Sequence, residues 1–75
     1  MESIRHKIET ADFGTMFKTR GGSRAIFLRI CSNFEHVMAD FYVKDWGMVR
    51  VNRENGMVFP GRDKEENDIV GLWEA

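Results

Sequence analysis

Two residues of this chain, Cys31 and His36, could form a nucleophilic catalytic pair, since they lie five residues apart. A cysteine thiol beside an imidazole can form a thiolate–imidazolium pair and act as a nucleophile. Such a pair also needs a third group that orients the base, and the sequence places none at a fixed spacing. Free cysteine is more often a buried, inert residue. We therefore predict no catalytic residue and no enzyme activity.

The sequence contains no motif typical of a metal-binding or phosphate-binding site. The two histidines and the one cysteine lack the close paired spacings of a structural zinc site. The acidic segment 63–68 lacks the alternating ligands and central glycine of a calcium loop, and its charge run is typical of a solvated loop. Gly21-Gly22 is not followed by the Lys-Ser/Thr of a phosphate-binding loop. We predict no metal, no cofactor and no small-molecule substrate.

Basic and aromatic side chains are interleaved along several strand-like segments, and this pattern is typical of binding surfaces. Small β-barrels hold single-stranded nucleic acid with a basic groove and aromatic platforms. The candidate binding surface consists of Arg24, Phe27, Arg29, Tyr42, Trp46 and Arg50. The net charge of −1, with Asp40 and Asp45 nearby, favours the alternative that the charges are solvated strand faces. In that alternative Phe27 and Tyr42 pack beneath the N-terminal arm or Trp73.

Large apolar residues are more numerous than one buried face of so short a chain can absorb. They include Phe27, Met38, Tyr42, Trp46, Met48 and Trp73. Exposed apolar patches mark partner sites, interface cores favour Trp, Tyr, Met and Arg, and a strand edge can accept a partner strand. We predict a non-enzymatic intracellular binding or interaction module whose partner is another protein or a second copy of itself. Weak binding of single-stranded nucleic acid by a small β-barrel is the alternative.

Composition sets the broad class of the protein. The chain has 75 residues, of which 43% are hydrophobic and 31% charged, as in a single globular domain. No apolar run approaches the roughly 20 residues of a membrane span, and the charged N-terminus is unlike a signal peptide. One cysteine allows no internal disulfide and fits a cytoplasmic location. The net charge of residues 1–30 is +3 and that of residues 31–75 is −4. This asymmetry is as compatible with self-association as with binding of a polyanion.

Strands must position these residues, and the alternation of side chains is clearest over residues 36–59. The odd-numbered residues of 37–43 are apolar and share one face, and the even-numbered residues of 38–44 share the other. The alternation resumes at 49–52. Asn55-Gly56 is typical of a type I′ hairpin turn, in which both residues have positive φ. This segment is therefore expected to form a three-stranded antiparallel meander.

Further strands are expected on both sides of this meander. Segments 16–19 and 24–30 flank a turn at 20–23, and 69–73 forms a closing strand. In the second of these strands we expect Ile26, Leu28 and Ile30 on one face and Ala25, Phe27 and Arg29 on the other. The predicted fold is mainly β, a small antiparallel meander of five to six short strands rolled toward an open barrel over residues 14–75.

The N-terminal segment, residues 1–13, is expected to form a short helix or a frayed arm. Ile4, Ile8 and Ala11 lie at helical spacing, and Ser3 is suited to cap the helix N-terminus. A helix of this length is marginal in isolation, so both alternatives stay open.

The turn at Phe17-Lys18-Thr19-Arg20-Gly21-Gly22-Ser23-Arg24-Ala25 resembles the opening hairpin of a set of small uncharacterised bacterial and prophage β-rich proteins. Those proteins carry a Thr-Arg-Asp-Gly-Arg-Lys-Ala type hairpin, a later Asn-Gly or Asp-Gly turn and an ending near Asp-Leu or Asp-Ile. Here the corresponding residues are Asn55-Gly56 and Asp68-Ile69, whereas Gly21 replaces the usual Asp and Ser23 the usual Arg. The resemblance covers about residues 17–73 and implies a β fold without an established activity.

Overall fold

The structure is a computed structural model that describes residues 3–31, 37–58 and 64–74. It contains α1 (Ile4–Glu9), β1 (Met16–Thr19), β2 (Arg24–Cys31), β3 (Met38–Val43), β4 (Gly47–Asn52) and β5 (Ile69–Leu72). The strands form one antiparallel sheet in the order β4-β3-β2-β1-β5. The predicted fold class, mainly β with a short N-terminal helix, is confirmed. Within the described residues, no helix has the length and apolar character needed to cross a membrane.

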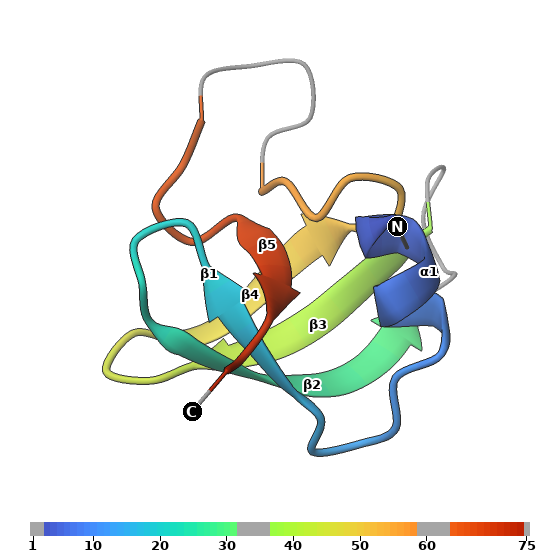
Figure 1. Ribbon diagram of the computed structural model, residues 1–75, viewed down its shortest axis with the longest axis horizontal. Coiled ribbons are helices and arrows are strands. Elements are labelled where there is room, and N and C mark those ends of the chain that lie inside the picture. Colours follow the sequence, from blue (N-terminus) through green and yellow to red (C-terminus); the bar gives the residue numbers. More distant parts are fainter. Residues whose placement is uncertain (1–2, 32–36, 59–63, 75) are drawn as a thin grey trace.

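The sheet bends back on itself, with β1 and β5 in front of β2, β3 and β4 in Figure 1. The inside of the bend holds the hydrophobic core. Three aromatic rings meet there, since the centroids of Phe17 and Phe41 are 5.1 Å apart and those of Phe27 and Phe41 are 5.5 Å apart. Edge-to-face packing of this kind stabilises a core beyond the burial of area alone. The hydrophobic core thus combines three packed phenylalanine rings with aliphatic side chains inside the bend of the sheet.

Helix α1 forms because its N-terminus is capped and its apolar side has somewhere to pack. The Ser3 hydroxyl accepts a hydrogen bond from the backbone N–H of His6, which confirms Ser3 as the cap. Ile8 is fully buried in the sheet core, with Ile4 packed against it. Arg5 and Glu9 form an ion pair one turn apart at 2.8 Å. Tertiary packing therefore supplies the stability that a six-residue helix lacks alone.

The two edges of the sheet approach each other beyond the end of β4. The backbone N–H of Ile69, at the start of β5, donates a hydrogen bond of 2.7 Å to the carbonyl of Gly56. The buried carboxylate of Asp68 stabilises this junction. It accepts hydrogen bonds from the backbone N–H groups of Val58 and Glu65 and forms an ion pair with Arg20. The sheet is not closed, but its ends are fastened together, as expected for a meander rolled toward an open barrel.

The predicted faces of β2 are wrong from its middle onward, and a β-bulge is the reason. Phe27 pairs with Phe41 and Arg29 pairs with the next residue, Asp40, so Leu28 is the extra residue. A bulge inserts one residue and reverses the alternation beyond it. Ala25 and Phe27 therefore lie in the core, while Ile26 and Arg29 lie together on the opposite face of the sheet.

The third strand of the predicted central meander is also absent over residues 57–58, and Phe59 lies outside the described residues. The chain turns tightly after β4, because the N–H of Gly56 donates to the carbonyl of Asn52 and the N–H of Asn52 donates to the carbonyl of Met57. The carbonyl of Gly56 then accepts a hydrogen bond from the N–H of Ile69. Gly56 has positive φ whereas Asn55 does not, so the turn is not type I′. Among the described residues, Asp45 in the β3–β4 turn is the non-glycine residue with positive φ.

Candidate functional site

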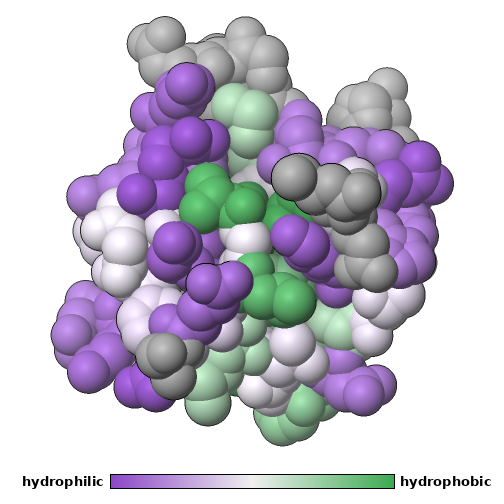
Figure 2. All heavy atoms as spheres, in the orientation of Figure 1, coloured by the Kyte–Doolittle hydropathy of each residue, from purple (hydrophilic) through white to green (hydrophobic). Residues whose placement is uncertain are grey.

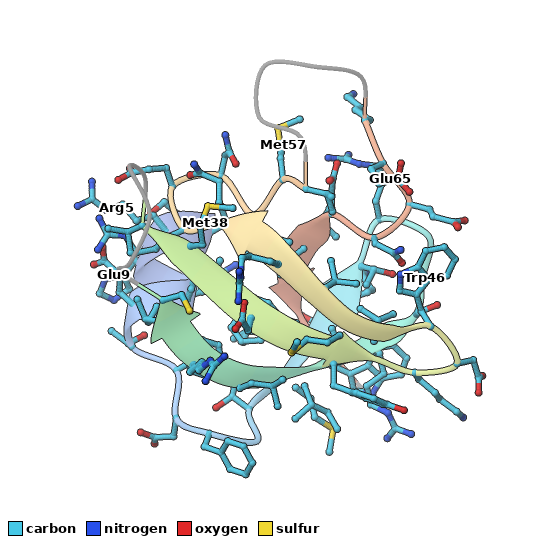
Figure 3. All side chains as sticks on the ribbon, turned by 180° about the vertical axis from the view of Figure 1, so that it is seen from behind. Arg5, Glu9, Met38, Trp46, Met57 and Glu65 are labelled. Atoms are coloured by element: carbon cyan, nitrogen blue, oxygen red, sulfur yellow. The ribbon has the colours of Figure 1, made fainter. Side chains whose placement is uncertain are left out.

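The outer face of the sheet, which is the face turned away from the phenylalanine core, carries apolar and charged side chains in parallel rows. In Figure 3 this face of β2, β3 and β4 points toward the viewer, with Met38 at one end and Trp46 in the β3–β4 turn at the other. In the opposite view, where α1, β1 and β5 lie in front and the outer side of these two strands faces the viewer, hydrophobic residues form separate patches among hydrophilic ones (Figure 2).

A continuous line of large apolar side chains crosses the outer face from one edge of the sheet to the other. Cross-strand pairing places Met16 opposite Ile26, Ile26 opposite Tyr42 and Tyr42 opposite Met48. Trp73 extends the line beyond β1, because its N–H donates to the carbonyl of Met16 at 3.0 Å. We call these five residues the apolar row. Met16, Tyr42 and Met48 are 45%, 50% and 62% exposed, so the row faces solvent rather than core.

Three cations run parallel to the apolar row on the side of the β3–β4 turn. Lys18 pairs with Arg24 across β1 and β2, and the backbone N–H of Lys44 donates to the carbonyl of Arg24 at 3.0 Å. We call Lys18, Arg24 and Lys44 the basic row. The Arg24 guanidinium lies over the Trp73 ring, 5.8 Å from its centroid, which ties the basic row to the apolar row.

A groove of about 380 Å³ opens between these two rows. Its walls are Met16, Arg24, Ile26, Tyr42 and Lys44, so three members of the apolar row and two of the basic row face one cavity. A concave site with apolar walls and a few charged groups at its rim is the usual form of a binding site. The centre of the outer face can therefore accept an apolar side chain close to two positive charges.

A row of charged side chains lies on the other side of the apolar row. Asp40 is fully buried and sits between Arg29 on β2 and Arg50 on β4. Its carboxylate accepts hydrogen bonds of 2.7 and 3.2 Å from Arg50 and of 3.0 Å from Arg29. We call these three residues the ionic row. The hydrogen bond from Arg50 is the main cause that lowers the pKa of Asp40, against the opposing effect of burial, and Arg29 adds to it.

The thiol of Cys31 lies beside this row and donates a weak hydrogen bond of 3.7 Å to Asp40. His36, the histidine considered as a possible partner of this thiol, lies outside the described residues. Over the ranges 3–31, 37–58 and 64–74, no group of three or more His, Cys, Asp or Glu side chains is arranged to hold a metal ion. Of the acidic segment, Asp68 is engaged with Arg20 and backbone amides, as described above.

The structure brings together four of the six residues predicted for the binding surface. Arg24, Arg29, Tyr42 and Arg50 share the outer face. Phe27 is 5% exposed, because it pairs with Phe41 on the core face, and the bulge that follows it turns Arg29 to the other face. Trp46 lies in the β3–β4 turn at the end of this face and lines a second groove, of about 440 Å³, with Met48 and Arg50. The candidate surface thus loses Phe27.

Sequence reasoning counted Met48 and Trp73 among the apolar residues in excess of the core, but it did not assign Met16 and Ile26 to the surface or align the four with Tyr42. Met16, Ile26, Met48 and Trp73 come from four different strands or their ends, and only the register of the sheet aligns them with Tyr42. Alternation along β1 and β2 could place Met16 and Ile26 on one face each. It does not show that these two faces are the same one.

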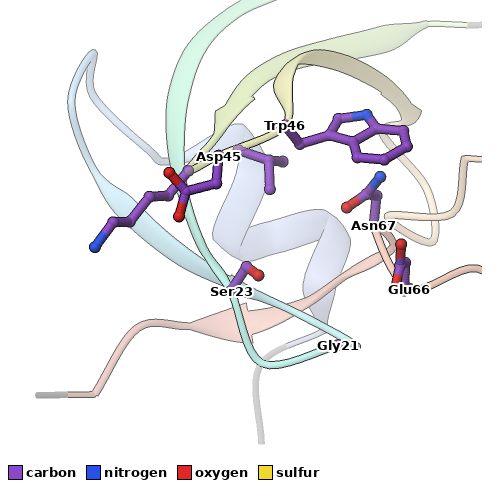
Figure 4. A pocket seen from close by; sticks show the side chains of 8 residues that line it. Gly21, Ser23, Asp45, Trp46, Glu66 and Asn67 are labelled. Atoms are coloured by element: carbon purple, nitrogen blue, oxygen red, sulfur yellow. The ribbon is translucent and has the colours of Figure 1, made fainter.

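A smaller pocket of about 170 Å³ lies between the β1–β2 turn, the β3–β4 turn and the segment before β5 (Figure 4). Gly21, Ser23, Asp45, Glu66 and Asn67 contribute to it, and the Trp46 ring lies along one side. Its lining is mainly polar and carries two carboxylates. It is thus unlike the apolar and cationic groove at the centre of the outer face.

Comparison of the chain with protein-family models, with curated proteins and with solved structures found no match.

Proposed function

We propose that this domain is a non-enzymatic binding module that captures another protein on the outer face of its sheet. The observation that carries the proposal is the apolar row, five large side chains aligned across the whole sheet with three of them about half exposed. Contiguous apolar surface on a small domain marks an interaction site, because its exposure to water is unfavourable unless a partner covers it. Methionine, tyrosine, tryptophan and arginine are the residues that interface cores favour.

The state of the buried carboxylates supports a binding role over a catalytic one. Asp40 is held by two arginines, and Asp68 is held by Arg20 and two backbone amides. A general acid or base needs a carboxyl group with access to a substrate and a pKa near the working pH. In Asp40 the arginines move the pKa in the opposite direction. A single free cysteine also supports a reducing, cytoplasmic setting for the module.

Binding of single-stranded nucleic acid is the second candidate function. It is favoured by the placement of Arg24, Arg29 and Arg50 around Tyr42 on one face, since phosphates and a stacked base would find cations and an aromatic ring together. The centre of the row weakens this candidate. Met16, Ile26 and Met48 offer no flat ring on which a base can stack.

Site-specific photo-crosslinking tests the proposal with two matched positions. A benzophenone amino acid replaces Tyr42 in the apolar row, or Phe13 in the turn before β1, which is 78% exposed and lies outside the row. Both changes exchange one exposed aromatic ring for another. After irradiation of cells that carry the protein, we expect adducts from position 42 and few from position 13. Digestion of the adducts with protease and with nuclease identifies the class of partner.

Protease-sensitive adducts confined to position 42 support a protein-binding face. Nuclease-sensitive adducts at position 42 would instead support binding of single-stranded nucleic acid on the outer face. Equal adducts at both positions, or none at position 42, contradict the assignment of the outer face.

A further inference from the structure

We infer that the segment docking on the apolar row is an acidic amphipathic helix of the partner protein, with its apolar stripe on the row and carboxylates along both flanks. This inference rests on the proposed function and specifies the chemistry of the partner. It is drawn from the order of the three rows on the outer face.

The charges on the outer face are strongly one-sided. The basic and ionic rows together hold five cations and one carboxylate, Asp40, which leaves a net charge of +4 on a chain whose total is −1. Two further carboxylates lie beside the rows, because Asp45 lines a pocket with Arg24, Lys44 and Trp73, and Glu65 lines the groove that holds Met48 and Arg50. Counting these two, the charge around the rows is still positive, at +2. A partner that covers the apolar row must therefore bring negative charge to both sides of it.

The spacing of the rows suits a helix. Because the sheet bends back at β1 and β5, a straight helix covers the part of the row from Met16 on β1 to Met48 on β4. Neighbouring strands lie about 4.8 Å apart, so this part is about 14 Å long, the length of about ten helical residues. Residues two apart on a strand are separated by about 6.7 Å, which sets the distance from the apolar row to each charged row. A helix about 10 Å wide that lies along the apolar row would thus carry its flanking side chains over Lys18, Arg24 and Lys44 on one side and over Arg29 and Arg50 on the other.

The same charges argue against a second copy of the chain as the occupant of this face. In a two-fold dimer that joins the apolar rows face to face, each basic row would lie over the basic row or the ionic row of the other copy. Both rows have a net positive charge, and like charges brought together in an interface oppose association. The composition of the row separates a helix from nucleic acid, since Met16, Ile26 and Met48 fit apolar side chains rather than bases.

Three helical peptides of about 14 residues test the inference with the purified protein. All share one apolar stripe, and their flanking positions are all Glu, all Gln or all Lys. A thymidine oligonucleotide is the fourth probe. We expect the Glu peptide to bind about tenfold more tightly than the Gln peptide at about 20 mM salt, with the Lys peptide weakest, because several rim charge pairs add to the apolar contact. The difference should shrink at about 500 mM salt, where the charges are screened.

A charge-reversal pair supplies the control. Lys44→Glu changes the basic row, and Lys7→Glu makes the same change of net charge on α1, outside the three rows. We expect Lys44→Glu to weaken the Glu peptide about fivefold and to strengthen the Lys peptide, and Lys7→Glu to change neither by more than about twofold. A variant that gains affinity for the Lys peptide must be folded, so misfolding cannot account for the result.

Each other outcome has a distinct meaning. Equal binding of the three peptides overturns the acidic partner and leaves the protein-binding face standing. Binding of the oligonucleotide with no binding of any peptide overturns both the acidic helical partner and the proposed protein-binding function. If no probe binds while position 42 still gives protease-sensitive adducts, the helix is wrong and the proposed function survives.

Discussion

Replacement of Gly56 by alanine should lower the free energy of unfolding by about 3 kcal/mol. Gly56 has a φ of 71°, a conformation that costs a residue with a side chain about 1 kcal/mol or more. An added Cβ would also overlap the carbonyl oxygen of Ile69 and would press against Ile4, 3.2 Å away. The backbone would have to separate where Ile69 donates its hydrogen bond to Gly56, which fastens the two ends of the sheet. Loss of that bond adds about 1–2 kcal/mol.

Gly22→Ala measures the cost of the positive φ alone, so that the difference between the two variants gives the steric part. Gly22 also has positive φ, 89°, but nothing lies within 4 Å of its added Cβ. We expect urea denaturation to give a loss of about 1 kcal/mol for Gly22→Ala and about three times as much for Gly56→Ala. In a domain of this size the larger loss corresponds to a fall in Tm of about 15 °C. Equal losses in the two variants would mean that the junction at Gly56 does not hold the sheet ends together.

Replacement of Asp40 by asparagine should destabilise the protein by about 2 kcal/mol at neutral pH. The change is nearly isosteric, but it removes the charge that accepts hydrogen bonds from Arg29 and Arg50, and such bonds contribute about 1.5–3 kcal/mol. The loss falls short of that for a fully buried pair because the Arg29 side chain is 64% exposed and can return to water. Asp45→Asn, an exposed change in the β3–β4 turn, should alter stability by less than about 0.5 kcal/mol.

The pH dependence of this difference follows from the direction of the pKa shift. Arg50 first, and then Arg29, lower the pKa of Asp40 below its ordinary value of 3.8 in the folded protein. The stabilisation is therefore fully present above pH 3.8 and disappears as the pH falls through the lower, folded-state pKa. Wild type and Asp40→Asn should thus differ at neutral pH and converge in stronger acid. A constant difference across this range would assign the effect to packing rather than to the ionic row.

Local sequence signals were sufficient for much of the fold. The alternation over 37–43 placed Ala39, Phe41 and Val43 on the core face of β3 and Tyr42 on the outer face, because a strand with one buried face alternates. It did not predict that Asp40, on the outer face, is buried as well. Ser3 predicted the start of α1, because a hydroxyl acceptor at that position satisfies a free backbone N–H. These features depend on neighbours within a few residues. They need no knowledge of the rest of the chain.

The errors arose where distant segments decide the local structure. The bulge at Leu28 has no marker in the sequence of β2, and it turns Arg29 to the outer face, away from the face of Phe27, where Arg29 meets Asp40. Asn55-Gly56 favours a hairpin locally, but the chain after it is drawn to Ile69 and Asp68. Tertiary hydrogen bonds therefore overrode turn propensity at this position.

The candidate site shows the same division. Tyr42, Arg24, Arg29 and Arg50 could be selected by residue type, because basic and aromatic groups on strands suggest binding. Their alignment with Met16, Ile26, Met48 and Trp73 into parallel rows depends on the register of five strands. That register is set by pairing between segments far apart in the chain, which the sequence pattern does not encode.

A methyl-resolved NMR titration with the Glu-flanked peptide tests most directly whether the apolar row is the binding surface. The methionine and isoleucine methyl groups supply probes inside the row, at Met16, Ile26 and Met48, and outside it, at Met57 and Ile8. The account predicts shifts at the three row positions that saturate together, with Met57 and Ile8 unchanged. Shifts centred on Met57 or Ile8, with the row unaffected, would contradict it.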